Sequence, residues 1–136
     1  MRVSRAKIFL MNKAIFLDRD GVINRDFGYT SSPDNFEFID GVFEACRRFR
    51  SQGFLLVVVT NQSGIARGYY TEEDFFSLTE WMLKEFDRHG VDISRVYYCP
   101  HHPSAGKGKY LQVCECRKPE PGMLFQAAKE LDIDLS

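Results

Sequence analysis

Two carboxylates directly follow a short apolar run near the start of the chain, and this feature restricts the fold more than any other. The run covers residues 14–17, and the acids are Asp18 and Asp20. Four consecutive apolar residues indicate a strand buried on both faces, and Gly21 permits a sharp exit of the backbone. Ligands of open α/β sheets bind beyond the carboxyl ends of strands. Asp18 and Asp20 are therefore candidate active-site residues, and an acidic surface turn is the alternative.

Strand-like and helix-like segments alternate along the rest of the chain, which predicts a parallel sheet with right-handed crossovers. Residues 54–59 are apolar throughout, so we expect a central strand there. The other predicted elements are a helix capped by Asp40 and ending at Gly53, a helix from a Thr71/Asp74 capping box to Gly90, a strand at 96–98 and a helix from Pro121 to Leu131. The predicted fold class is α/β.

A second polar cluster follows the central strand, at residues 60–64 (Thr-Asn-Gln-Ser-Gly). Thr60 and Ser63 offer hydroxyls, Asn61 offers an amide, and Gly64 lets backbone N–H groups approach a ligand closely. Such donors suit phosphate oxygens. Because the strands are parallel, this cluster is expected at the same edge of the sheet as Asp18. The sequence therefore predicts a phosphate-binding site there.

Composition and charge narrow the function classes. The chain has 136 residues with 44% hydrophobic content, enough for one domain with a core. A net charge of −1 does not favour a nucleic-acid partner, and no apolar run is long enough to span a membrane. The chain is therefore interpreted as cytoplasmic, where cysteines stay reduced and bind metals more often than they form disulfides.

Three cysteines and a histidine have the spacing of a closed metal shell. Cys99 and His101 form a Cys-x-His pair, and Cys114 and Cys116 form a Cys-x-Cys pair. Four such ligands complete a tetrahedral shell without an open position, which is typical of structural zinc. Two alternatives remain, namely chance clustering of reduced cysteines and the use of His102 in place of His101.

Three other segments carry predictions. Arg117 and Lys118 directly follow the predicted metal loop at 99–116 and are expected to be held rigidly by it, although a solvated charge pair is the alternative. Residues 26–29 (Asp26, Phe27, Gly28 and Tyr29) are expected to form a flap over the strand ends, or else an ordinary surface loop. Residues 1–13 are predicted to be a loose basic arm before the domain.

The ordered motifs together resemble a known family. They are Asp18-Arg-Asp-Gly-Val-Ile-Asn24, Thr60-Asn-Gln-Ser-Gly-Ile-Ala-Arg-Gly68, Cys99-Pro-His-His-Pro103 and Cys114-x-Cys-Arg-Lys-Pro119. The chain from 14 to 136 is similar to the haloacid-dehalogenase phosphatases, within them to the D-glycero-D-manno-heptose 1,7-bisphosphate 7-phosphatase branch. The resemblance implies a Rossmann-like parallel sheet with a zinc-binding loop and a phosphatase acting on heptose precursors of lipopolysaccharide.

The resemblance also implies residue roles. Asp18 would be the nucleophile that forms an aspartyl-phosphate, and Asp20 would exchange protons with the leaving group and water. Thr60 and Lys118 would hold the phosphoryl oxygens, and Arg117 would recognise the substrate. Asp18 and the main-chain carbonyl of Asp20 would bind Mg²⁺. Residues that would line the substrate pocket are Asp26, Phe27, Gly28, Tyr29, Asn61, Gln62 and Ser63, and Zn²⁺ would be bound by Cys99, His101, Cys114 and Cys116.

One departure from the family pattern changes the expectation for this chain. The family supplies a further Mg²⁺-binding aspartate from a downstream strand-Gly-Asp segment. Asp132 and Asp134 are poor substitutes, because no apolar strand precedes them. The C-terminal strands are therefore expected to be missing, the Mg²⁺ site to be incomplete and the activity of these 136 residues to be doubtful. The edge of residues 15–17 would then be exposed and favour self-association of an otherwise monomeric protein.

Two functional alternatives are kept beside the heptose phosphatase. One is a histidinol-phosphate phosphatase, the nearest related branch. The other is a zinc-stabilised module without catalytic activity. A nucleic-acid-binding zinc protein is disfavoured, because the charge is balanced and no basic helix is evident.

Overall fold

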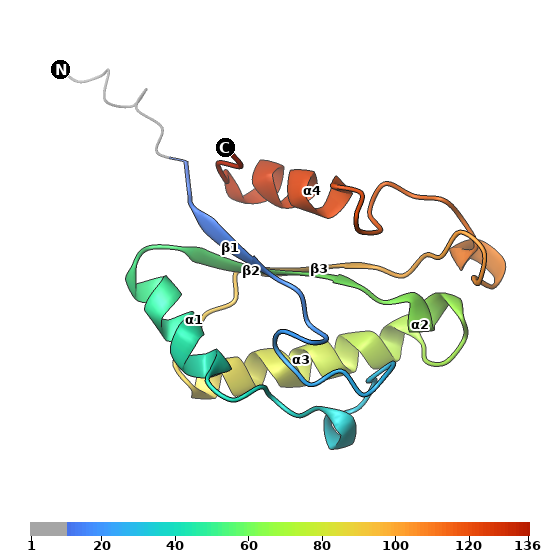
Figure 1. Ribbon diagram of the computed structural model, residues 1–136, viewed down its shortest axis with the longest axis horizontal. Helices are drawn as coiled ribbons and strands as arrows, with labels where there is room; N and C mark the ends of the chain where they lie inside the picture. Colours follow the sequence, from blue (N-terminus) through green and yellow to red (C-terminus); the bar gives the residue numbers. More distant parts are fainter. Residues whose placement is uncertain (1–10) are drawn as a thin grey trace.

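A three-stranded parallel sheet lies at the centre of the computed structural model, which describes residues 11–136 (Figure 1). Its strand order is β1 (Ala14–Leu17), β2 (Leu55–Asn61) and β3 (Arg95–Cys99). Both pairings are parallel, with Leu17 opposite Val58 and Thr60 opposite Tyr98. The predicted α/β class with a parallel sheet is confirmed.

Burial differs between the two strands whose tips are polar. In β2, residues 56–60 are all buried, as predicted for a central strand. In β1, all four residues are only half-buried, so the prediction of a strand buried on both faces is wrong for this element. The reason is position: β1 is an edge strand of the described sheet and is paired along its length with β2 alone.

Helices cover both faces of the sheet. The helices α1 (Val42–Ser51) and α3 (Glu72–Arg88) lie on one face, and α4 (Gly122–Leu131) lies on the other (Figure 1). Successive strand side chains point to opposite faces. Leu56 and Val58 accordingly pack in the core with α1 and α3, while Val57 and Val59 pack with α4. Within the described part of the chain, no helix is long and apolar enough to cross a bilayer.

The helix ends test the predicted capping signals. The capping box of α3 is present: Asp74 N donates to Thr71 Oγ1 at 3.0 Å, and Thr71 N donates to Asp74 Oδ2 at 2.9 Å. The predicted cap of α1 is wrong. Gly41, with φ of 85°, occupies the N-cap position instead of Asp40 and adopts a left-handed conformation that side-chain-bearing residues disfavour. The short helix α2 (Ser63–Ala66), inside the predicted polar cluster, was not anticipated.

The segment after α4 reaches back to the start of the sheet. Ile133 forms a parallel bridge with Asn12, and Asp134 N donates to Asn12 O at 2.9 Å. The neighbouring carbonyl of Lys13 bonds to Leu55 on the opposite side. Of the predicted basic arm, residues 1–10 lie outside the described residues, and Asn12 is tied to the segment that follows α4.

Glu72 joins three elements around the loop that carries the cysteines. It lies in the first turn of α3, and its carboxylate accepts hydrogen bonds from the Tyr98 hydroxyl on β3 and from the Tyr110 hydroxyl at 2.6 Å. Tyr110 belongs to the short 3₁₀ turn Gly108–Tyr110 in the middle of that loop. The hydroxyl donors of Tyr110 and Tyr98 hold the pKa of Glu72 below its ordinary value. The loop is therefore anchored to the helical layer by a charge-assisted contact.

We expect Glu72→Gln to lower the free energy of unfolding at pH 7 by about 1 kcal/mol, because neutral Gln accepts hydrogen bonds less strongly than a carboxylate. A depressed folded-state pKa gives stability that is present above the ordinary value of 4.5 and lost as the pH falls through the folded value. Denaturant unfolding from pH 7 to 3 should therefore show the two proteins converging at low pH. Glu73→Gln, one residue along the same turn, is the control and should leave the profile unchanged.

Candidate active site

The carboxylate of Asp18 and the ammonium of Lys118 meet at the carboxyl end of β1. Lys118 Nζ lies 3.0 Å from Asp18 Oδ2 and donates to Val59 O at 3.1 Å. Asp18 Oδ1 accepts from the backbone N–H of Arg19 at 2.7 Å. The Asp18 side chain is 41% exposed, so one face of the carboxylate is open to a ligand.

Asn61 holds the backbone of Lys118 with both ends of its amide. Lys118 N donates to Asn61 Oδ1 at 2.9 Å, and Asn61 Nδ2 donates to Lys118 O at 3.2 Å. These two residues are 57 positions apart in the sequence. Asn61 was predicted to line the substrate pocket. Its amide instead binds the Lys118 backbone and so positions the Lys118 ammonium next to Asp18.

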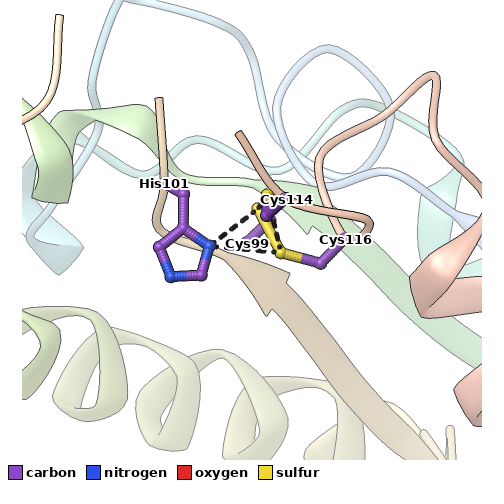
Figure 2. Close-up of side chains that lie close together, drawn as sticks. All are labelled: Cys99, His101, Cys114 and Cys116. Carbon is purple, nitrogen blue, oxygen red and sulfur yellow. Dashed lines mark hydrogen bonds between the residues drawn. A yellow bond between two sulfur atoms is a disulfide. The ribbon is translucent and has the colours of Figure 1, made fainter. Parts of the chain in front are cut away.

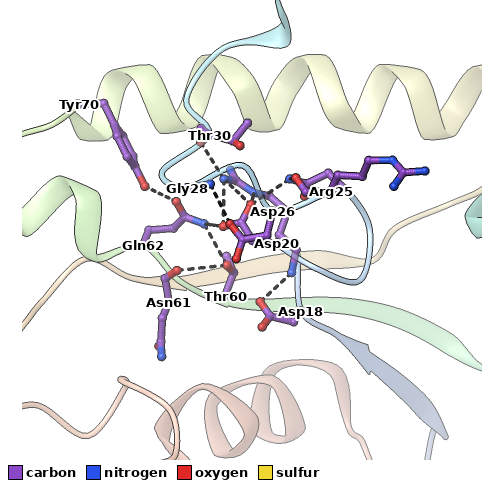
Figure 3. Close-up of polar contacts among 12 residues, drawn as sticks. Asp18, Asp20, Arg25, Asp26, Gly28, Thr30, Thr60, Asn61, Gln62 and Tyr70 are labelled. Atoms are coloured by element: carbon purple, nitrogen blue, oxygen red, sulfur yellow. Dashed lines mark hydrogen bonds and ion pairs between the residues drawn. The ribbon is translucent and has the colours of Figure 1, made fainter. Parts of the chain in front are cut away.

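Asp20 lies among side-chain donors from two segments, the loop after β1 and the residues after β2 (Figure 3). Asn24 Nδ2 donates to Asp20 Oδ1 at 2.9 Å, and Gln62 Nε2 lies 3.4 Å from Asp20 Oδ2. The same Gln62 nitrogen donates to Thr60 Oγ1 at 2.9 Å. The structure thus brings the tips of β1 and β2 together, as the parallel sheet predicted. Thr60 and Gln62 are both almost fully buried, whereas Ser63 is half-buried at the start of α2.

Arg19 is a buried cation that the sequence reading did not single out. Its side chain is only 2% exposed and forms an ion pair with Asp20 at 3.1 Å. Its Nη2 also donates to the Thr30 carbonyl at 2.9 Å, and its guanidinium lies 5.8 Å and 5.9 Å from the rings of Phe36 and Phe75. The position of Arg19 between two acidic residues in the sequence was the pattern that could have indicated its role. Arg19 fixes the loop after β1 and the orientation of Asp20.

The predicted flap is more exposed than the strand tips. Gly28 N donates to Asp26 Oδ1 at 3.0 Å, which closes a tight turn, and the Phe27 side chain is 60% exposed. The ring of Tyr29 packs edge-on against Tyr69, with centroids 4.7 Å apart. The flap is therefore joined to the segment that follows α2.

Two further arginines gather near the tip of β2 without an acidic partner among the described residues. Arg67 Nη2 lies 3.5 Å from His102 Nε2. Burial and then the charges of Arg117 and Arg67 lower the pKa of His102. Arg67 Nε and Arg117 Nη1 are buried and lack a hydrogen-bond partner. Unpaired buried donors on two cations form an environment that suits an anion.

The four predicted metal ligands converge. The ligating atoms of Cys99, His101, Cys114 and Cys116 all lie within 4.8 Å of one another (Figure 2). Cys114 Sγ is 3.3 Å from both other sulfurs, and Cys116 Sγ is 3.4 Å from His101 Nδ1. His102 lies outside this group: its Nδ1 accepts from the backbone N–H of Ala105 at 2.8 Å. The cluster is a candidate metal centre.

The cluster has two mutually exclusive chemical forms. The sulfurs of Cys99 and Cys116 are within bonding distance, as in a disulfide. A metal instead requires both as thiolates. The convergence of Cys114 and His101 on the same point favours the metal form, because a disulfide alone leaves them without a function. Three thiolates and one imidazole in a closed shell fit Zn²⁺.

Comparisons with known proteins agree with this geometry. The family model described as polynucleotide kinase 3 phosphatase matches residues 13–136. The D-glycero-beta-D-manno-heptose-1,7-bisphosphate 7-phosphatase of Haemophilus influenzae is 60% identical over 91% of this chain and 67% of its own length. The protein of the same name from Yersinia pestis is 58% identical over 90% of this chain and 65% of its own length.

The chain belongs to the haloacid-dehalogenase-like phosphatases, in the heptose bisphosphate phosphatase branch. A solved D,D-heptose 1,7-bisphosphate phosphatase from B. bronchiseptica, complexed with magnesium and phosphate, has a TM-score of 0.78 and 35% identity over 91% of this chain and 66% of that chain. The predicted family is thus confirmed. The chain spans about two thirds of the length of these relatives.

Asp18 and Asp20 offer oxygen donors of the kind that Mg²⁺ binds. Mg²⁺ takes six oxygen ligands and usually keeps several waters. The half-exposed carboxylate of Asp18 at a strand end fits such an ion. Within residues 11–136, the grouped potential ligands are the Cys/His set alone, so no third carboxylate joins Asp18 and Asp20. These residues fit Mg²⁺ as two ligands of an incomplete shell.

Proposed function

We propose that this chain carries the catalytic residues of a phosphatase that hydrolyses the C7 phosphate of D-glycero-D-manno-heptose 1,7-bisphosphate, a precursor of lipopolysaccharide heptose, in the cytoplasm. The observation that carries the proposal is the contact between Lys118 Nζ and Asp18 Oδ2 at 3.0 Å. It places a cation where a phosphoryl group bonded to Asp18 needs charge neutralisation. The names of the relatives support the substrate.

The chemistry proceeds in two balanced steps on Asp18. An Asp18 oxygen forms a bond to phosphorus while the bond to the sugar oxygen breaks, and Asp20 gives its proton to that oxygen. Water then attacks the phosphorus, Asp20 takes a proton from it, and the bond to Asp18 breaks to release phosphate. Lys118 and the Thr60 hydroxyl hold the equatorial phosphoryl oxygens. Asp18 and the Asp20 carbonyl would hold Mg²⁺, which would offset the repulsion between the anionic nucleophile and the anionic ester.

The unpaired arginines favour a bisphosphate over the runner-up substrate. Asp18, Lys118 and Thr60 accommodate one phosphate, and Arg67 and Arg117 offer a second cationic region without an acidic partner among the described residues. Histidinol phosphate carries one phosphate and an amine, and a cationic amine is repelled by two arginines. We therefore assign Arg67 beside Arg117 to recognition of the second phosphate. The flap residues Asp26–Tyr29 are proposed to border the sugar, because Tyr29 lies 5.9 Å from the Arg67 guanidinium.

The metal cluster is proposed to bind structural Zn²⁺ and to hold the backbone ahead of Arg117 and Lys118. We expect one Zn²⁺ per chain by native mass spectrometry under reducing conditions. Cys114→Ser should lose the metal and destabilise the loop, because a thiolate ligand is removed. Cys46→Ser, at a buried cysteine distant from the cluster, is the control and should keep the zinc even if it lowers stability. A reduced wild-type protein without bound metal would contradict the assignment.

Turnover is measured on the chain extended by the strand-Gly-Asp segment expected downstream of residue 136, called the extended chain below. We expect Asp18→Asn to abolish phosphate release from heptose bisphosphate, because an amide oxygen is a poor nucleophile toward phosphorus. It should also prevent beryllium fluoride from binding, as followed by ¹⁹F NMR. Circular dichroism should show an intact fold. Phosphate release that persists in this variant would rule out the covalent mechanism.

The role of Arg67 is tested with two substrates. We expect Arg67→Met to raise KM for the heptose bisphosphate by roughly tenfold, because a charge-assisted contact is lost. KM for the 7-monophosphate should stay within about twofold, since it has no second phosphate. Arg88→Met, at the exposed end of α3, should change neither value. Equal effects of Arg67→Met on both substrates would exclude a second-phosphate role.

A further inference from the structure

A buried glutamine connects the acid Asp20 to the interior of the protein. Gln62 is 2% exposed. Its Nε2 donates to Thr60 Oγ1 at 2.9 Å and lies 3.4 Å from Asp20 Oδ2, and its Oε1 accepts from the Tyr70 hydroxyl (Figure 3). Four side chains, from the tip of β2, the loop after β1 and the segment before α3, therefore form one continuous hydrogen-bond network that ends at the site.

The donor-to-acceptor direction of these hydrogen bonds is set by Asp20 at one end and Tyr70 at the other. The Asp20 oxygens accept hydrogen bonds from Arg19, Asn24 and Gln62 in the structure, so the Gln62 nitrogen faces Asp20 and the Gln62 oxygen faces Tyr70. Tyr70 must then be the donor. Burial raises the pKa of Tyr70 to about 12, so its hydroxyl keeps the proton that it donates. Without that hydroxyl, the amide oxygen would be a buried acceptor without its partner.

The same direction of hydrogen bonding orients the Thr60 hydroxyl for binding a phosphate. A hydroxyl group has one proton, and Thr60 Oγ1 is already an acceptor for Gln62. Its own proton is directed at the Asn61 carbonyl across a long distance of 3.4 Å. The Thr60 proton is therefore free to be donated to a phosphoryl oxygen at the tip of β2. If the amide turned over, its oxygen would instead attract this proton inward.

The close approach of Gly64 to the Tyr70 ring is independent evidence that this ring has a fixed position. A Cβ at Gly64 would lie 2.2 Å from Tyr70 Cε1, so only glycine leaves room for the ring against α2. Gly64 was expected to let backbone N–H groups approach a ligand. Its observed neighbour is the phenol that orients Gln62.

We propose that Tyr70 is a positioning residue of the phosphatase site, which acts through Gln62 to fix the Asp20 carboxylate and the Thr60 hydroxyl proton for phosphoryl transfer. The catalytic consequence rests on the proposed function. The orientation of the Gln62 amide does not depend on the proposed function. Tyr70 is 7% exposed and reaches the site only through Gln62.

The kinetic test compares two buried tyrosines in the extended chain. Tyr70→Phe should lower kcat for the heptose bisphosphate by roughly tenfold, the loss expected for one oriented hydrogen bond, with KM within about twofold. Tyr97 is the matched control: it is 8% exposed, and its hydroxyl donates to Glu130 on the α4 side of the sheet. Tyr97→Phe should leave kcat and KM within about twofold. Gly64→Ala keeps the phenol but displaces its ring, and should reproduce the loss of kcat.

A second readout does not need turnover. In ¹⁵N NMR spectra, the Gln62 side-chain amide protons should exchange slowly with solvent in the wild type and in Tyr97→Phe, and quickly in Tyr70→Phe. Unchanged Gln62 exchange in Tyr70→Phe would overturn the proposal. So would an unchanged kcat, or a kcat loss that Tyr97→Phe shares. If the wild type releases no phosphate from any phosphorylated sugar, the proposed function fails, and the amide exchange alone decides the inference.

Discussion

The parallel pairing of β1 with β2 is the constraint on which the site depends. Leu17 lies opposite Val58, so the residues that follow both strands emerge at one edge of the sheet. Asp18 and Thr60 are thereby neighbours without any loop having to place them. Loops vary in conformation more easily than a paired sheet does, so this arrangement gives Asp18, the proposed nucleophile, and the Thr60 hydroxyl a rigid base.

Lys118, the cation next to Asp18, is positioned by a loop and not by the sheet. Lys118 follows the loop that carries the cysteine cluster, and the Asn61 amide forms two hydrogen bonds with the Lys118 backbone. The sheet and the metal loop therefore meet through two hydrogen bonds at the tip of β2. Glu72 anchors the middle of the same loop to α3. The loop is held at three places, and each of them restricts where the Lys118 ammonium can lie.

Local patterns predicted much of this arrangement. An apolar run ending in acids located Asp18, a capping box located the start of α3, and cysteine spacing located the metal cluster. Contacts between distant segments could not be predicted from the sequence. Neither the Asn61–Lys118 pairing nor the packing of Tyr70 against Gly64 produces a periodic pattern of residue types. The Asp40 cap failed for a related reason: the chain enters α1 through a left-handed glycine, and the side chain that looked like a cap stands one residue too early.

The bridge between Asn12 and Ile133 has a consequence for how the chain folds. Asn12 Nδ2 donates to Leu131 O across 119 residues, so the residues just before β1 are tied to the segment that leaves the last described helix. Such non-local contacts form late, because the intervening chain must first be ordered. On the ribosome, Asn12 emerges long before Leu131 and Ile133, so these contacts cannot form until both segments have left the tunnel. The entry into β1 therefore stays without these hydrogen bonds until nearly all of the described residues have been synthesised.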